Sequence, residues 1–145
     1  MKQEDKDLLL QDLCGRLPYG VKCRYQHIQY VENGKIIDIN MFGLVNVDGH
    51  IKDICDIKPY LFPLSSMTEG QTEEVHNLIY QGVAESIEET KEWLKTRKEN
   101  ELRPITLTYI LSYTLVIDWF CKNHFDYRGL IPMGLAMDAT NLNIY

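Results

Sequence analysis

Apolar and polar positions follow a helical period near the N-terminus and alternate further along the chain. In residues 4–14 the apolar positions recur every three or four residues on one face, and the charged positions, Asp12 among them, fall elsewhere. The apolar face consists of Leu9, Leu10, Leu13, Cys14 and Leu17. This pattern predicts a first helix, which Gly15 and Pro18 end.

From residue 20 onward the pattern becomes the alternation of a β-strand. One side carries Val21, Cys23, Tyr25, His27 and Gln29, and the other carries Lys22, Arg24, Gln26, Ile28 and Tyr30. Two tight-turn dipeptides, Asn33-Gly34 and Asp48-Gly49, are typical of connections between antiparallel neighbours. Gly43 indicates a bulge or bend. The region therefore predicts a three-stranded antiparallel meander over roughly residues 20–57.

Residues 58–64 predict an extended connection. They contain Pro59 and Pro63, and proline lacks the backbone N–H that a helix interior or a central strand requires. We therefore expect this segment to lie outside the interior of the sheet.

The second half of the chain predicts helices. Thr68 and Gln71 have capping-box spacing, and a helical stripe follows as far as Arg97, with Gly82 as a point where it divides. Residues 107–124 predict a last long helix that is apolar on nearly every side. Such a helix is either central in the fold or packed against a second copy of the chain. A homo-oligomer is therefore one explanation of this pattern.

After the last helix, residues 126–133 predict at most one helical turn, because Pro132 cannot donate a backbone hydrogen bond. Gly134 allows the chain to reverse, and residues 135–137 could add a short edge strand. Taken together, the elements predict a single α+β domain over residues 1–145. Its small antiparallel sheet packs against the N-terminal helix and a helical C-terminal half.

Composition narrows the class of protein. A chain of 145 residues with 45% hydrophobic and 25% charged residues is an ordinary globular domain, and its net charge of −6 disfavours nucleic acid and anionic membranes as partners. Residues 105–121 are the most apolar stretch, but Asp118 interrupts them, so we expect no membrane span. A charged N-terminus without a signal-type segment and four dispersed cysteines predict a cytoplasmic protein with reduced thiols.

The four candidate metal ligands are Cys23, His27, Cys121 and His124. Each cysteine shares a face with its histidine, so the four could meet if the strand packed on the helix. Structural zinc sites normally present each ligand pair at a tight turn, however, and cysteine is a common buried residue. We expect core packing, no metal and no cofactor. The sequence also lacks the glycine-rich, serine-hydrolase and metalloprotease motifs of many enzymes.

The candidate binding residues are His124, Asp126, Tyr127 and Arg128, and no catalytic residue is assigned. In an extended backbone the histidine, aspartate and arginine would project to the same side, which allows an acid–base or binding role. The structural alternative is that Asp126 caps a short turn, while Arg128 pairs with it or with a carboxylate elsewhere. We favour the structural role and place a binding role second.

Three segments resemble a known family. They are LLLQDLCGRLPYGV at 8–21, IKPYLFPLSSMTE at 57–69 and HFDYRGLIPMGLAM at 124–137. All three resemble a family of small proteins encoded by gut Bacteroidetes and by their phages and mobile elements. The chain departs from the family pattern at Phe62, where arginine is usual, and at Gly70, where an acidic residue is usual. The family has no established activity, so the resemblance implies no catalytic residues.

Two functions of different class follow from these observations. The first is a non-enzymatic accessory protein of a phage or mobile element that acts by protein–protein interaction. The alternative is a small enzyme or ligand-binding protein with a pocket near His124, Asp126 and Arg128.

Overall fold

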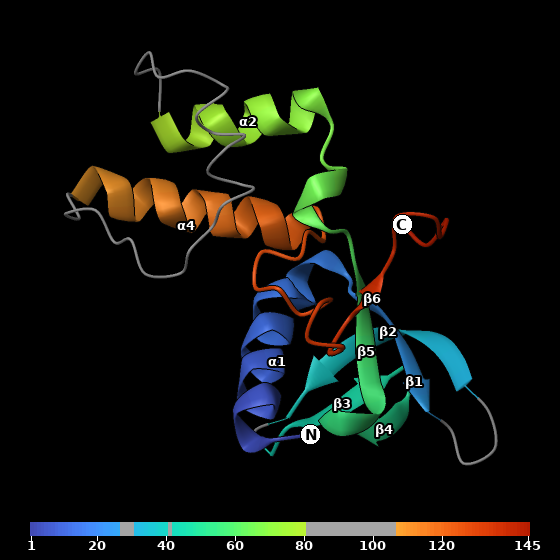
Figure 1. Cartoon of the computed structure of the whole chain (residues 1–145). Coiled ribbons are helices and arrows are strands. Elements are labelled where there is room, and N and C mark those ends of the chain that lie inside the picture. Colours follow the sequence, from blue (N-terminus) through green and yellow to red (C-terminus); the bar gives the residue numbers. More distant parts are fainter. Residues whose placement is uncertain (27–30, 41, 81–106) are drawn as a thin grey trace.

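The computed structural model describes residues 1–26, 31–40, 42–80 and 107–145. The described elements are α1 (Gln3–Arg16), β1 (Lys22–Gln26), β2 (Val31–Ile39), β3 (Leu44–Val47), β4 (His50–Asp53), β5 (Ile57–Leu61), α2 (Glu69–Tyr80), α4 (Leu107–Lys122) and β6 (Met137–Asp138). Short 3-10 turns occupy Leu17–Tyr19, Ile54–Asp56 and Leu64–Ser66. The fold is α+β, as predicted. Figure 1 shows α1 along one side of the sheet, with α2 and α4 side by side at one end.

Helix α1 is longer than predicted, and its buried face differs from the predicted one. The helix runs through Gly15 to Arg16, and the left-handed residue Gly20, at φ 75°, follows the 3-10 turn. Its buried residues are Leu9, Asp12, Leu13 and Arg16, whereas Cys14 is exposed. Asp12 was predicted to lie away from the buried face and is buried, and Arg16, which lay beyond the predicted helix, is buried as well.

Within the described residues, six strands form one sheet in the order β4-β3-β2-β1-β5-β6. The pairs from β4 to β5 are antiparallel, and β6 pairs with β5 in parallel. The predicted meander is present, but it contains four strands before β5. The predicted edge strand also exists, at Met137–Asp138 instead of 135–137.

The hairpin predicted at Asn33-Gly34 is wrong, because both residues lie inside β2. Asn33 is paired with Arg24, and Gly34 with Cys23. A Cβ at Gly34 would lie 2.5 Å from Val47 Cγ1 and 3.0 Å from Tyr25 Cε1. Glycine is therefore required there by the close approach of neighbouring side chains, and its turn-forming conformation is not used.

The turns at Asp48-Gly49 and Gly43 agree better with the prediction. Asp48 and Gly49 have φ values of 48° and 89°, and they connect β3 to β4. Two successive positive φ angles are what a tight two-residue hairpin requires. Gly43, at φ 74°, lies in the connection between β2 and β3.

Pro59 lies within the sheet, contrary to prediction. It is paired with Cys23 of β1, so β5 is flanked by β1 on one side and by β6 on the other. Strand β6 has only two residues, and these pair with Tyr60 and Leu61. Pro59 thus has no partner residue on the β6 side, and a proline fits where the ladder is not continuous.

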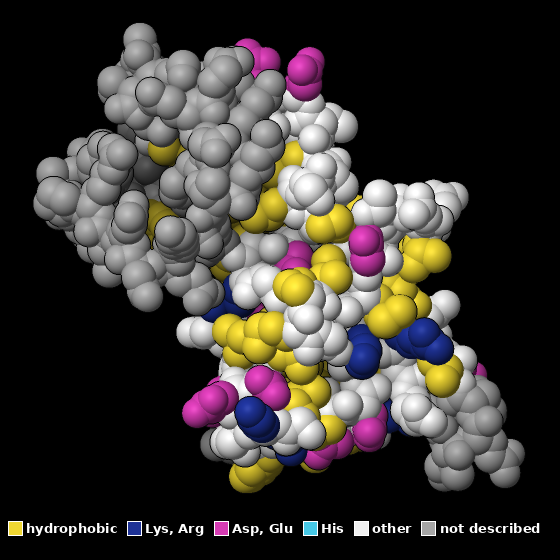
Figure 2. Space-filling view, in the orientation of Figure 1, with side chains coloured by type: hydrophobic (Ala, Val, Ile, Leu, Met, Phe, Trp, Pro, Cys, Tyr) yellow, Lys and Arg dark blue, Asp and Glu magenta, His cyan; other side chains and the backbone are white. Residues whose placement is uncertain are grey.

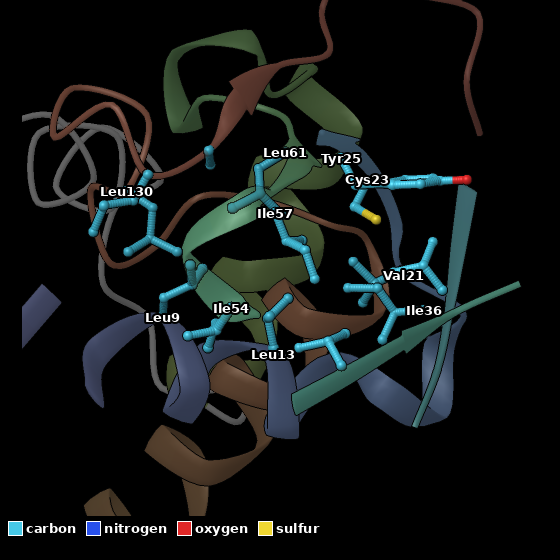
Figure 3. Packing of buried hydrophobic residues seen from close by; sticks show 14 residues of the cluster. Leu9, Leu13, Val21, Cys23, Tyr25, Ile36, Ile54, Ile57, Leu61 and Leu130 are labelled. Carbon is cyan, nitrogen blue, oxygen red and sulfur yellow. The ribbon is translucent and has the colours of Figure 1, made fainter. Parts of the chain in front are cut away.

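The core of the sheet lies between its inner face and α1. Alternate residues of the strands point inward, including Val21, Cys23, Ile36 and Val45, and they pack with Leu9 and Leu13 of α1 (Figure 3). Leu130, Leu135 and Ala136 of the tail complete this cluster. Burial of these apolar side chains is the main force that holds α1 and the tail on the sheet.

The described helical residues form a second cluster. Val75 of α2 packs with Val116, Phe120 and Cys121 of α4, and Trp119 Nε1 donates to Glu74 Oε2 at 2.9 Å. The predicted cap is confirmed, since Thr68 N donates to Gln71 Oε1 at 2.9 Å. Gly82, Arg97 and the helical stripe beyond α2 lie outside the described residues. Among those that are described, no helix is long and apolar enough to cross a membrane.

Candidate functional site

The tail begins where α4 ends, and it is fixed to the residue that follows β5. His124 adopts a left-handed backbone with φ 58°. Its carbonyl accepts from Phe62 N at 2.9 Å, and Asp126 N donates to Phe62 O at 2.8 Å. These two bonds place residues 124–126 beside the end of β5.

Asp126 caps a turn, as the structural alternative predicted. Its Oδ1 accepts from Leu130 N and its Oδ2 from Ile131 N, both at 2.8 Å. The side chain is buried. Both carboxylate oxygens are thus committed to backbone N–H groups of the turn.

Arg16 and Asp12 form a buried ion pair under the tail. Arg16 Nε lies 2.7 Å from Asp12 Oδ2, and both side chains are fully buried. The guanidinium also donates to two carbonyls, to Phe120 O at 3.3 Å and to Phe125 O at 2.7 Å. Burial alone would lower the pKa of Arg16, but the Asp12 carboxylate offsets this and the pKa is raised. Every part of this pair is therefore satisfied by protein groups, which a buried charge requires.

Arg128 shares the same carboxylate. Its Nε lies 3.4 Å from Asp12 Oδ1 and donates to Tyr127 Oη at 3.0 Å, while Nη1 donates to Gln11 Oε1 at 3.1 Å. The prediction that Arg128 pairs with a carboxylate elsewhere is confirmed. The partner is on α1, so this contact joins the two ends of the sequence.

Tyr127 lies against both guanidinium groups. The Arg16 and Arg128 Cζ atoms lie 5.3 Å and 5.0 Å from the centre of its ring. Burial raises the pKa of Tyr127 to about 12, and the nearby Cys121 and Asp12 add to this effect. The phenol stays neutral near pH 7 and provides an aromatic face for two cations.

His124 does not join this group. No hydrogen bond or ion pair links it to Asp126 or Arg128 within the described part of the chain; its ring instead stacks on Tyr145 at 3.8 Å. The side chain is 7% exposed, and its Nδ1 is buried without a hydrogen-bond partner. Burial, together with the charges of Arg16 and Lys22, lowers the pKa of His124 to about 4. The imidazole is therefore neutral near pH 7.

The cysteine–histidine candidates do not form a ligand cluster. Cys23 belongs to the core between the sheet and α1, whereas Cys121 belongs to the cluster of α2 and α4. His27 lies outside the described residues. In the ranges that the structure describes, no group of three or more His, Cys, Asp or Glu side chains is placed to hold a metal ion.

The face of the sheet that is turned away from α1 carries exposed apolar side chains. We call Ile37, Phe42, Leu44 and Ile51 the apolar patch; they are 55%, 81%, 36% and 61% exposed. Ile51 is paired with Asn46, and Leu44 lies two residues before Asn46 on β3, so Leu44 and Ile51 share one face of the sheet. Ile37 lies at the register shift in β2, and Phe42 lies in the connection between β2 and β3. Hydrophobic periodicity does not reveal this patch, because the same residue types fill the inner face.

No family model, curated protein or solved structure matches this chain. The chemistry of the tail and the surface of the sheet are thus the observations from which function is inferred.

Proposed function

We propose that this protein acts by binding another protein and that the apolar patch is its contact surface. The observation that carries the proposal is the exposure of four large apolar side chains on β2, β3 and β4 and in the connection between β2 and β3. Exposed apolar residues that occur singly are normal, but a cluster on one face is typical of a contact surface. Phe42, at 81% exposure, is the most prominent of the four.

The partner contacts the face of the sheet and not its edge. Strand β4 is the edge nearest the apolar patch, and its Lys52 points inward with Nζ 5.1 Å from the centre of the Tyr25 ring. An inward-pointing charge on a short edge strand discourages the addition of another strand. The outward side chains of β2, β3 and β4 have no such protection, so a folded partner surface with apolar side chains fits them.

The chemistry of the tail favours binding over catalysis. Both oxygens of Asp126 bind backbone N–H groups, and Arg128 is engaged by Asp12, Gln11 and Tyr127. A general acid or base needs a titrating group that can reach a substrate. Neither of these two residues offers one.

The setting that we propose is a phage or mobile element of a Bacteroidetes host, with the protein in the cytoplasm as an accessory factor. The resemblance of the three sequence segments supports this setting. The four cysteines are free thiols, which suits a reducing compartment.

The test compares capture by a patch variant with capture by a matched control. The patch variant is Phe42→Ser/Ile51→Ser, and the control is Met133→Ser/Leu142→Ser, which removes two apolar side chains that are also exposed. Each tagged protein is crosslinked in host lysate, and the captured proteins are identified by mass spectrometry. We expect a partner that wild type and control capture equally and that the patch variant loses. Hydrogen exchange should then show protection of β3 and β4 in the complex.

Two results would overturn the proposal. One is a set of captured proteins that does not change in the patch variant. The other is a wild-type dimer in sedimentation that Phe42→Ser/Ile51→Ser converts to a monomer, because the patch would then serve a second copy of the chain.

The alternative, a small enzyme or ligand-binding protein near His124, is supported by one observation. The Nδ1 atom of His124 is buried without a hydrogen-bond partner. A small molecule with a hydrogen-bond donor could satisfy that nitrogen. Thermal shift against a metabolite library tests this, and stabilisation of wild type but not of His124→Asn would support it.

A further inference from the structure

Four cationic side chains cluster on the outward face of the sheet, on strands adjacent to the apolar patch. We call Lys22, Arg24, Lys35 and Lys58 the basic patch; all four are exposed. Lys22 is directly opposite Lys35 on β2, and Arg24 is directly opposite Lys58 on β5. Figure 2 shows dark blue side chains gathered over the region where Figure 1 places β1 and β2.

This arrangement lowers the stability of the sheet. Like charges at directly opposed positions repel one another across a strand pair. Lysines on edge strands can be explained as protection against aggregation, but β1 lies between β2 and β5 and is not an edge. Lys58 lies where β5 has no β6 partner, but Lys22 and Arg24 lie on an inner strand, so their like-charge pairs need an explanation outside the folding of this chain.

In the part of the chain that the structure describes, none of the four side chains of the basic patch forms an ion pair with a carboxylate. The carboxylate of Asp48 is close to Lys35, but its Oδ2 accepts from the backbone N of Lys35, at 3.0 Å. That oxygen lies on the inward side of β2, since a Cβ added to Gly34 would be 2.7 Å from it. Lys22 Nζ donates to the Ile144 carbonyl, which is neutral. The positive charge of the outward face is thus available to a partner.

Resting on the proposed function, we infer that the partner protein carries an acidic segment that binds the basic patch next to its apolar contact. The two patches meet on β2, where Lys35 and Ile37 are two residues apart. The basic patch spans β2, β1 and β5, a width of about 10 Å, which about three residues of an extended peptide would cover. Glutamate or aspartate side chains at that spacing complement the four cations.

The same face is poorly suited to nucleic acid. Single strands bind to basic sheet surfaces by stacking bases on exposed aromatic rings. Two aromatic residues lie on this part of the face. Tyr60 is 5% exposed and donates its hydroxyl to Asn33 Oδ1 at 2.6 Å. Tyr145 is 41% exposed, but its ring is already stacked on His124 and lies 5.8 Å from Lys22 Nζ. The net charge of −6 would also repel a long polyanion beyond the patch.

The test is a titration of the whole protein with fluorescein-labelled hexaglutamate at low salt. The patch variant is Arg24→Gln/Lys58→Gln. The charge-matched control is Lys2→Gln/Lys122→Gln, which removes two exposed cations, one at the N-cap of α1 and one at the end of α4. We expect binding about tenfold weaker in the patch variant and unchanged in the control, since one or two charge pairs are lost. Arg24→Lys/Lys58→Arg should restore wild-type binding. The denaturation midpoint of the patch variant should be equal to or above that of wild type, which excludes unfolding as the cause.

Three outcomes would overturn the inference. They are equal affinity of patch and control variants, tighter binding of single-stranded oligothymidine than of hexaglutamate, and tighter binding of phosphatidylserine vesicles. The phenotype of Phe42→Ser/Ile51→Ser is measured separately, so failure here leaves the apolar contact standing.

Discussion

Arg16 Nη2 donates to the carbonyl of Phe125 at 2.7 Å, across 109 residues of sequence. The same guanidinium binds Asp12 one turn earlier in α1. One side chain therefore joins the first helix to the residues that follow α4. Because both charges are fully buried, this pair stabilises the fold only as long as all of its partners are in place.

Arg16→Met should lower the free energy of unfolding by about 3–5 kcal/mol, since it leaves Asp12 buried with only Arg128 nearby. Urea unfolding followed by circular dichroism measures the change. Glu4→Gln, on the exposed side of the same helix, is the control and should stay within about 0.5 kcal/mol of wild type. Similar stabilities of the two variants would show that the ion pair contributes little.

Asp126→Ala should lower the free energy of unfolding by about 3 kcal/mol, because two backbone N–H groups in a largely buried turn lose their acceptors. Asp138→Ala is a matched control. That aspartate also accepts from a backbone N–H, Thr140 N at 2.9 Å, but it is exposed and water can replace it. If Asp126→Ala lowers the free energy of unfolding no more than the control does, the capping role is wrong. Asp126 would then again be a candidate binding residue.

His124 should make the protein less stable in mild acid. Its pKa is about 4 in the folded protein against an ordinary 6.5, so between these values the unfolded chain binds the proton and the folded chain does not. Stability contributed by the neutral ring is complete above pH 6.5 and falls as the pH drops toward 4, by about 2–3 kcal/mol.

The measurement is urea unfolding of wild type and His124→Asn across that pH range. Asparagine tolerates the left-handed backbone at this position, so the substitution removes the titration with little strain. We expect the difference in stability between the two proteins to change with pH. A constant difference would mean that His124 titrates normally in the folded state.

Gly34→Ala should destabilise by about 1–3 kcal/mol, because the new methyl group would overlap Val47 and Tyr25. Gly70→Ala provides the opposite case. Gly70 lies in the first turn of α2 with nothing near its Cβ position, so alanine should stabilise by about 0.4–1 kcal/mol. Thermal unfolding gives the change in Tm of each variant relative to wild type. Equal changes in Tm would contradict the packing role of Gly34.

Gly34 and Gly49 show how far sequence patterns predict the sheet. Asp48-Gly49 and Asn33-Gly34 carry the same turn signal, yet only the first forms a turn. The pattern cannot distinguish a glycine needed for its backbone from one needed for its lack of a side chain, since the second need arises from strands that meet in three dimensions. Pro59 is a related case, because the length of its neighbour β6 determines whether a proline is tolerated.

The candidate site was only partly predictable for a similar reason. The cap at Asp126 follows from local chain geometry, and the spacing of polar groups predicted it. Asp12 was placed away from the core because periodicity treats charged residues as solvent-facing, and Arg16 lay beyond the predicted end of the helix. The spacing of four residues between Asp12 and Arg16 is typical of an ion pair on one helix face and could have indicated their contact. The carbonyls that also bind Arg16, however, lie 104 and 109 residues after it in the sequence.

The long reach of Arg16 also determines when the protein can fold. A ribosome releases α1 well before it adds Phe120 and Phe125, so the nascent helix has its guanidinium but not the two carbonyls that bind it. Burying that charge early would be unfavourable, so docking of α1 on the sheet must wait until Phe120 and Phe125 have been synthesised. The first helix of the chain is therefore among the late elements to reach its final contacts.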